Sequence, residues 1–253
     1  MNQVTDQQII EILRKEAVPA LGCTEPVACA LACAKCKEVL GGVPERLDVL
    51  VSGNIYKNGM GVGIPGTGMV GLPIAAALGA VCGKSEYGLE VLKEVNVGDN
   101  LQRAKDMLGQ VTVSLKEDAP DKLYAEALAT KGNDTVKVII AHTHTNIVLV
   151  EKNGDEIFKR EFRLDTSKPE DKGPELSVKR IWDFVHEVDV KDIEFVLQGA
   201  EMNKAISAEG LNSEYGLQIG KTLKENIDKG LLEDDLLNRT LIRATAASDA
   251  RMD

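Results

Sequence analysis

The sequence predicts an α+β fold, with helices at both ends and a mainly antiparallel sheet at about residues 111–162. Apolar residues recur with helical spacing near both ends of the chain. Between Val111 and Phe162 they instead alternate along short segments, and Asn153-Gly154 is a strong hairpin signal. With 253 residues, of which 43% are hydrophobic, the chain is long enough to bury a core.

The N-terminal segment contains two predicted helices. Thr5 with Gln8 three residues later is a capping-box signature, so a first helix should follow and run to about Glu16. Pro26 suits the first turn of a second helix, because its missing N–H costs nothing there. This helix should run through an Ala-rich stretch to about Leu40 and end at a Gly-Gly pair.

The next part of the chain combines a strand, a glycine-rich segment and two helices. The alternating residues 46–52 predict the strand. Nine glycines between residues 53 and 83 indicate backbone that turns tightly or approaches a ligand. The compositions of residues 70–81 and 100–108 favour helices.

The β region should form an antiparallel meander, which is the simplest arrangement of its segments. The predicted strands are residues 111–117, 123–130, 135–141, 146–152 and 156–162. The charged stretch 166–174 should be a loop, and three or four helices should fill the remainder from Glu175. No repeat or linker is evident, so we expect one domain with a β-rich subdomain.

Composition and charge exclude several classes of protein. A net charge of −10 argues against a nucleic-acid surface, because phosphate binding needs clustered Lys and Arg, so a small-molecule substrate is favoured. The apolar run 70–82 is too short to span a bilayer, and the N-terminus does not have the pattern of a signal peptide. The five cysteines are an odd set and should be free thiols or ligands, which predicts a cytoplasmic protein.

The segment PALGCTEP, residues 19–26, is the first candidate site. It places Cys23 just before a helix, where N–H groups and the helix dipole favour the thiolate, and Thr24 and Glu25 follow in the first turn. Cys23 is therefore a candidate base, nucleophile or metal ligand. The alternative is a small buried cysteine beside a helix cap.

A glycine-rich segment with polar side chains is the second candidate site. Hydroxyl, amide and ammonium groups on such backbone could hold the carboxylate and amine of an amino acid. It is neither a Walker A loop nor a dinucleotide fingerprint, and a purely structural connection is the alternative. The candidate substrate-binding residues are Ser52, Gly53, Asn54, Lys57, Asn58 and Thr67.

Two further motifs carry ligand-type residues but favour a structural interpretation. Cys29, Cys33 and Cys36 form CxxxCxxC, yet inside a helix they share one face, so a buried small-residue face is favoured over a cluster. His142 and His144 would share one face of a regular strand and could bind a metal, but no third ligand is evident. His186 should lie at the surface or at the edge of the core.

Four segments together resemble a known family: PALGCTEP, SGNIYKNGMGVGIPGTGMVGLPIAAALG, AHTHTNIVLVE and ATAASDARM. They resemble the L-cysteine desulfidase family, which is similar to the alpha chain of iron–sulfur-dependent L-serine dehydratase. The resemblance covers the whole chain in the right order and makes residues 1–253 similar to the N-terminal part of that domain.

The resemblance implies a lyase that eliminates the β-substituent of a small amino acid and yields pyruvate and ammonia. L-cysteine is the expected substrate, with L-serine as the alternative, and a [4Fe–4S] cluster acts on the leaving group without pyridoxal phosphate. Cys23 takes the place of the family's N-terminal cysteine, which is expected to act as base or to approach the cluster.

The chain departs from the family in length. Family members are longer and carry the cysteines expected to bind the cluster in their C-terminal half, so a C-terminal segment or a second subunit should supply them. A homo-oligomer is also expected. The alternative from another class of function is a cluster-free amino-acid-binding or regulatory module.

Overall fold

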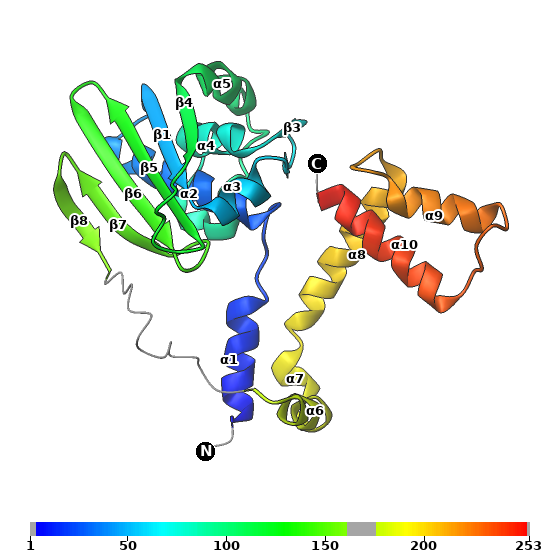
Figure 1. Ribbon diagram of the computed structural model, residues 1–253. Helices are drawn as coiled ribbons and strands as arrows, with labels where there is room; N and C mark the ends of the chain where they lie inside the picture. Colours follow the sequence, from blue (N-terminus) through cyan, green and yellow to red (C-terminus); the bar gives the residue numbers. More distant parts are fainter. Residues whose placement is uncertain (1–3, 161–175, 252–253) are drawn as a thin grey trace. The chain divides into compact units, whose positions relative to one another are not determined.

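The computed structural model describes residues 4–160 and 176–251, and these form two compact units (Figure 1). Of the described residues, 20–160 with 215–217 and 248–251 make up an α/β unit. Residues 4–19, 176–214 and 218–247 make up a helical unit. The described helices are α1 (Asp6–Glu16), α2 (Thr24–Leu40), α3 (Gly53–Gly59), α4 (Leu72–Val81), α5 (Asn100–Met107), α6 (Val178–Glu187), α7 (Val190–Ile193), α8 (Val196–Asn212), α9 (Ile219–Asp228) and α10 (Leu236–Arg251), with short 3-10 helices η1 (Ser85–Glu90) and η2 (Leu108–Gln110).

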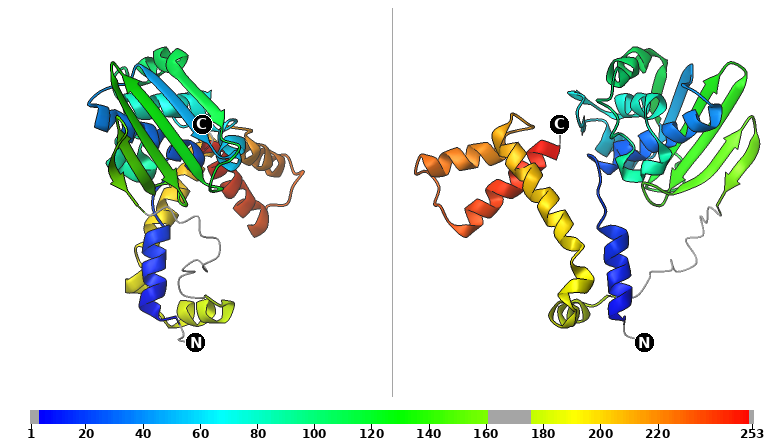
Figure 2. Two further views of the ribbon diagram at one scale, coloured as in Figure 1. Left: turned by 60° about the vertical axis from the view of Figure 1, so that its left-hand side comes forward. Right: turned by 180° about the vertical axis from the view of Figure 1, so that it is seen from behind.

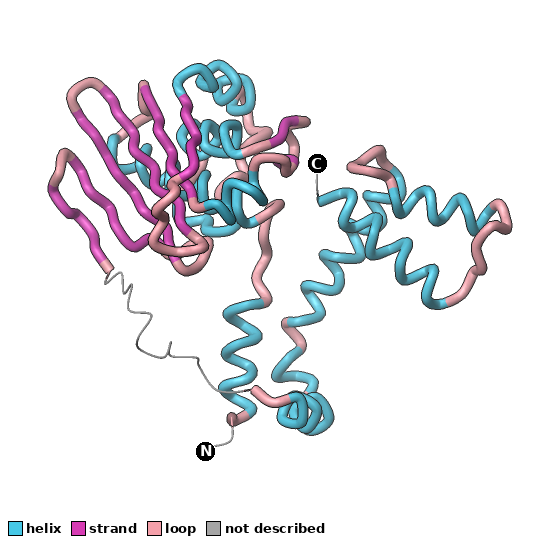
Figure 3. Tube along the Cα trace, in the orientation of Figure 1, coloured by secondary structure: helices cyan, strands magenta, loops and turns pink. Residues whose placement is uncertain are grey.

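The centre of the α/β unit is a mixed six-stranded sheet, shown as strands in Figure 3. Its strands are β1 (Arg46–Val51), β4 (Val111–Leu115), β5 (Tyr124–Lys131), β6 (Asp134–Ala141), β7 (Ile147–Lys152) and β8 (Asp155–Lys159). Their order is β4-β1-β5-β6-β7-β8, and every neighbouring pair is antiparallel except β1 with β4. The α+β fold with a mainly antiparallel sheet is therefore confirmed.

The predicted meander is right for β5 to β8 and wrong for β4. That strand pairs in parallel with β1, which separates it from β5. The connection from β1 to β4 passes through α3, α4 and α5, and such a crossover is what two parallel strands require. The predicted extension of the sheet to Phe162 lies outside the described residues.

Helix α2 is the central element of the core and packs against α4 and against strands β5 and β6 (Figure 2). Cys29, Cys33 and Cys36 are fully buried in it, so the prediction of a buried small-residue face is confirmed. Burial extends around most of the helix, because α4 approaches very closely. A Cβ added at Gly79 would lie 2.2 Å from the carbonyl oxygen of Ala30.

Local signals set the boundaries of the first elements as predicted. The Thr5 hydroxyl and the Gln8 side chain form both hydrogen bonds of the capping box at the start of α1. Gly41 ends α2 in the left-handed conformation, with φ of 72°. The first part of the glycine-rich segment forms helix α3, which is capped by the Ser52 hydroxyl. Strands β2 (Gly63–Ile64) and β3 (Met69–Val70) follow as a short hairpin.

Helices α1 and α6 of the helical unit share a small apolar cluster. Ile9, Ile10 and Phe184 are buried in one apolar cluster with Val4. Arg180 is buried beside them, where it donates to the Val4 carbonyl oxygen at 2.6 Å and forms an ion pair with Asp6. The segment after residue 176 contains α6 to α10, which is more helices than predicted. The predicted loop 166–174 and residue 175 lie outside the described residues.

The lengths and compositions of the helices within residues 4–160 and 176–251 bear on membrane insertion. None of these helices combines the length and the apolarity that crossing a bilayer requires.

Candidate functional site

Cys23, Glu25 and Asn58 form a hydrogen-bonded group at the start of α2. The Cys23 thiol donates to Oε2 of Glu25 at 2.8 Å. The other carboxylate oxygen, Oε1, accepts a hydrogen bond from Nδ2 of Asn58 at 3.1 Å. Cys23 occupies the N-cap position of α2, and Asn58 lies near the end of α3. The fold therefore joins the two predicted site segments through one carboxylate, and we call Cys23, Glu25 and Asn58 the thiol–carboxylate group.

The protonation states of this group follow from burial and from the short thiol contact. Burial raises the pKa of Cys23, and the hydrogen bond to Glu25 raises it further. Backbone N–H groups of the first turn act in the opposite direction, as the helix start predicts, but they do not prevail. Burial alone would raise the pKa of Glu25, but the hydrogen bonds from Cys23 and Asn58 hold it below its usual value. The pair therefore rests as a thiol donating to a carboxylate, not as the thiolate that the helix dipole suggests.

The two histidines of the AHTHTN segment lie in a turn, and the prediction that they share one face of a regular strand is wrong. Strand β6 ends at Ala141, and His142 has a positive φ of 70°. The His142 ring lies 2.5 Å from Asp121. Burial lowers the pKa of His144, whereas the charge of Glu25 raises it. His144 is thus a neutral imidazole near the thiol–carboxylate group at neutral pH.

Two hydroxyl groups of the predicted substrate segment are engaged by the backbone. Ser52 is 2% exposed; its hydroxyl donates to the Lys122 carbonyl oxygen at 2.6 Å and accepts from the N–H of Ile55 at 3.4 Å. The Thr67 hydroxyl donates to the Ile64 carbonyl oxygen at 2.6 Å in the β2–β3 turn. Both hydroxyls hold the backbone in position. A substrate could contact them, as predicted, only in competition with these hydrogen bonds.

The remaining predicted site residues lie on α3 and at the start of α2. Asn54 and Lys57 are exposed on α3, the helix that also carries Asn58, and Gly53 is its first residue. Thr24 begins α2 between the two members of the thiol–carboxylate pair. Of these α3 side chains, Asn58 is the one that reaches Glu25.

A metal centre made of this chain's own residues has little support in the described geometry. All five cysteines are free thiols, and four of them are buried, whereas Cys23 is partly exposed. Among residues 4–160 and 176–251, no three His, Cys, Asp or Glu side chains are grouped so as to hold a metal ion. The described residues therefore do not form a ligand set for the [4Fe–4S] cluster that the resemblance implies.

Comparison with known proteins adds relatives but no activity. The chain is 47% identical over 249 residues to a UPF0597 protein of Actinobacillus pleuropneumoniae serotype 3 (strain JL03), and this match covers 98% of the chain and 57% of the relative. UPF0597 proteins of Dichelobacter nodosus (strain VCS1703A) and Shewanella pealeana (strain ATCC 700345 / ANG-SQ1) are each 47% identical, over 252 and 253 residues. These two matches cover 99% and 96% of the chain, and 58% of each relative.

The chain thus spans rather more than half the length of these curated relatives. No family model matches it. No solved structure matches it either. The name of the relatives specifies no activity, so the resemblance to L-cysteine desulfidase stays a prediction.

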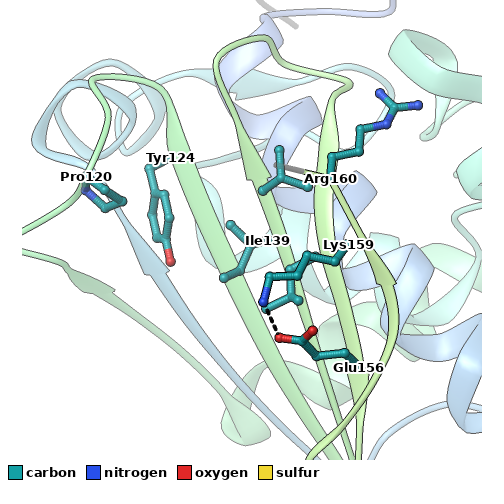
Figure 4. Close-up of a pocket in the computed structure, with 8 residues that line it drawn as sticks. Pro120, Tyr124, Ile139, Glu156, Lys159 and Arg160 are labelled. Atoms are coloured by element: carbon teal, nitrogen blue, oxygen red, sulfur yellow. Dashed lines mark hydrogen bonds and ion pairs between the residues drawn. The ribbon is translucent and has the colours of Figure 1, made fainter. Parts of the chain in front are cut away.

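A separate cavity of about 280 Å³ lies on the sheet of the α/β unit (Figure 4). Tyr124, Ile139 and Val148 contribute apolar surface, and Lys159 pairs with Glu156 beside them. The Tyr124 hydroxyl donates to Glu126 at 2.7 Å, and burial raises the pKa of this phenol. The remaining lining residues are Pro120, Leu149 and Arg160, so the cavity includes none of the predicted site residues.

Sequence reasoning missed two features of the thiol–carboxylate group. It grouped Glu25 with Cys23 but did not connect Glu25 with Asn58, because 33 residues separate the two in the chain. It also paired His144 with His142 and not with Glu25. The Asn146 side chain, which donates to the Ala141 carbonyl oxygen at 2.9 Å, is a turn signal that could have revealed the bend.

Proposed function

We propose that this chain carries the proton-transfer half of a lyase that eliminates the β-substituent of a small L-amino acid. L-cysteine is the proposed substrate and L-serine the alternative, as the resemblance implies. The observation that carries the proposal is the Cys23 thiol donating to Glu25, whose second oxygen is held by Asn58. A fixed thiol with a carboxylate behind it can move a proton without leaving a buried charge unpaired.

Cys23 and Glu25 act together in the removal of the α-proton. The sulfur of Cys23 takes the proton from Cα while its own proton passes to Glu25. The electrons of the broken C–H bond form the Cα–Cβ double bond, and the C–S bond breaks with its electron pair on the departing sulfide. The resulting 2-aminoacrylate tautomerises to an imine, which water converts to pyruvate and ammonia.

The amino-acid carboxylate and the leaving group need further contacts. Lys57, exposed on α3 beside Asn58 in sequence, is the proposed cation for the substrate carboxylate. In the complete enzyme a [4Fe–4S] cluster would supply Lewis-acid assistance to the leaving group. Because the described residues do not form its ligand set, we propose that a C-terminal segment or a second subunit supplies the ligands.

The cellular location and the oligomeric state of the enzyme are also part of the proposal. Five free thiols support a cytoplasmic location, since an oxidising compartment favours disulfides. We also propose a homo-oligomer, for which sedimentation of the complete enzyme is the direct measurement.

The proposal is tested by measuring pyruvate formation from L-cysteine and L-serine under anaerobic conditions. The assay is run on this chain and on the full-length Actinobacillus pleuropneumoniae relative, with the iron content of both determined. Cys23→Ala should lower kcat by about 10²- to 10⁴-fold, because the reaction loses its base. Lys57→Met should lower kcat/KM by about 10- to 150-fold with little change in the thermal midpoint.

Cys82→Ala is the matched control, because Cys82 is a free thiol at the C-terminal end of α4 and has no proposed role in the reaction. Full turnover in the Cys23→Ala enzyme would contradict the proposal. If calorimetry detects binding of either amino acid while neither protein forms pyruvate, the chain is an amino-acid-binding module instead. Absence of both binding and turnover in the relative would exclude both functions.

A further inference from the structure

One face of helix α6 carries an exposed stripe of large apolar side chains. Val178, Ile181, Trp182 and Val185 are 86%, 44%, 65% and 62% exposed. Their spacing of three and four residues places them on the same side of the helix. We call these four residues the α6 stripe. Folded proteins rarely leave a contiguous apolar surface of this kind uncovered unless it binds a partner.

The α6 stripe is not needed to hold α6 in the helical unit, because another side of the helix does this. Phe184 is buried with Ile9 and Ile10 of α1, and Arg180 is buried against the Val4 carbonyl oxygen. Helix α6 therefore has two apolar faces, of which one is covered within its own unit. The second face is left uncovered by the described residues of the helical unit.

The polar residues of α6 flank the stripe and do not interrupt it. Lys179 forms an ion pair with Asp183 at 2.7 Å along one side. The His186 ring lies 4.4 Å from the Trp182 ring, centroid to centroid, and its Nδ1 lies 2.8 Å from the Trp182 carbonyl oxygen. The indole is thus supported on one side before any partner binds. Tryptophan is one of the side chains enriched among the residues that dominate the binding energy of interfaces.

We propose that the α6 stripe binds a helix of another polypeptide segment. This segment corresponds to the part of the longer relatives that the present chain does not match. The chain covers 57% to 58% of the relatives described above, so about two-fifths of their length has no counterpart in it. A stripe with helical spacing accepts a second helix, whose side chains fill the grooves between its ridges. The same unit also exposes Leu236 and Leu237 on α10, at 83% and 66%, so its uncovered apolar surface is not confined to α6.

Trp182 allows a direct test, because it is the only tryptophan in the 253 residues. The chain is fused to, and separately co-expressed with, the unmatched part of the Actinobacillus pleuropneumoniae relative, in which any tryptophan is replaced by phenylalanine. Docking should shift the Trp182 emission to shorter wavelength and reduce its quenching by iodide. Val185→Asp should reverse both effects in the fusion and weaken binding of the separate part by about 30-fold or more.

Val97→Asp is the matched control, because Val97 is 60% exposed in the α/β unit and is the same residue type as Val185. It should leave emission and affinity unchanged, while circular dichroism checks that both variants stay folded. Iodide quenching that is equal in the fusion and in the chain alone would overturn the proposal. So would a homodimer of the chain alone that Val185→Asp dissociates, since a second copy would then be the occupant.

Discussion

Substitution of Gly79 by alanine should destabilise the α/β unit, although the same change stabilises an ordinary helix. In the middle of an exposed helix, alanine is favoured over glycine by about 1 kcal/mol. At Gly79, however, the new Cβ would lie 2.2 Å from the carbonyl oxygen and 2.8 Å from the carbonyl carbon of Ala30. These are backbone atoms inside α2, so no side-chain rotation can relieve the contact.

The magnitude follows from how far the two helices would have to separate. Real Cβ atoms essentially never come within 3.0 Å of another heavy atom in this way, so α2 and α4 must move apart by about 0.8 Å. Overpacking of a buried site costs about 1–3 kcal/mol, and a contact between two helix backbones belongs at the upper end. After subtraction of the helix-propensity gain, Gly79→Ala should lose about 2 kcal/mol and lower the thermal midpoint by about 4–8 °C.

The assay is thermal unfolding followed by circular dichroism, with two other helix glycines as comparisons. Gly199 lies inside α8 with open space around its Cβ position, so Gly199→Ala should raise stability by about 0.5–1 kcal/mol. Gly210 lies in the same helix but its Cβ would meet the Ala246 carbonyl oxygen at 2.0 Å, so Gly210→Ala should destabilise the helical unit. A midpoint for Gly79→Ala equal to or above that of the unchanged chain would refute the reasoning.

Two further predictions concern titrating groups. Iodoacetamide should modify Cys23 first, since the other four cysteines are buried. Glu25→Gln should speed this modification, because it removes one cause of the raised Cys23 pKa. Mass spectrometry at pH 7 to 8 measures both effects, and slower modification of Cys23 in Glu25→Gln would contradict the assignment. Glu38 accepts hydrogen bonds from the Ser85 N–H and hydroxyl at 2.7 and 2.6 Å, which, against the effect of burial, hold the Glu38 pKa below its usual 4.5. Its carboxylate therefore stabilises the fold above pH 4.5, and this contribution is lost as the pH falls through the lowered pKa. The difference in thermal midpoint between the unchanged chain and Glu38→Gln should be largest at neutral pH and should shrink as the pH falls below 4.5. A difference that does not change with pH would exclude the stabilising role of the Glu38 carboxylate.

Signals that act over a few residues could be interpreted correctly from the sequence. The capping box at Thr5 and Gln8 starts α1, Gly41 ends α2, and the Asn153-Gly154 turn joins β7 to β8. Each of these depends on hydrogen bonds or dihedral angles within one turn, so neighbouring residues contain the whole cause. The start of α2 at Cys23 belongs to the same class, and with it the position of the candidate thiol.

Features that depend on distant segments were decided by the tertiary structure. Strand β4 pairs with β1 and not with β5, because the inserted helices carry the chain back in the parallel direction. The Cys23 thiol rests protonated although a helix start favours the thiolate, because burial and the Glu25 carboxylate act more strongly than the helix dipole. Asn58 reaches Glu25 from a helix 33 residues away, a contact that no local pattern encodes. The sequence by itself therefore determined the locally signalled element boundaries and the position of the thiol, whereas packing determined the partners and the protonation state of the candidate site.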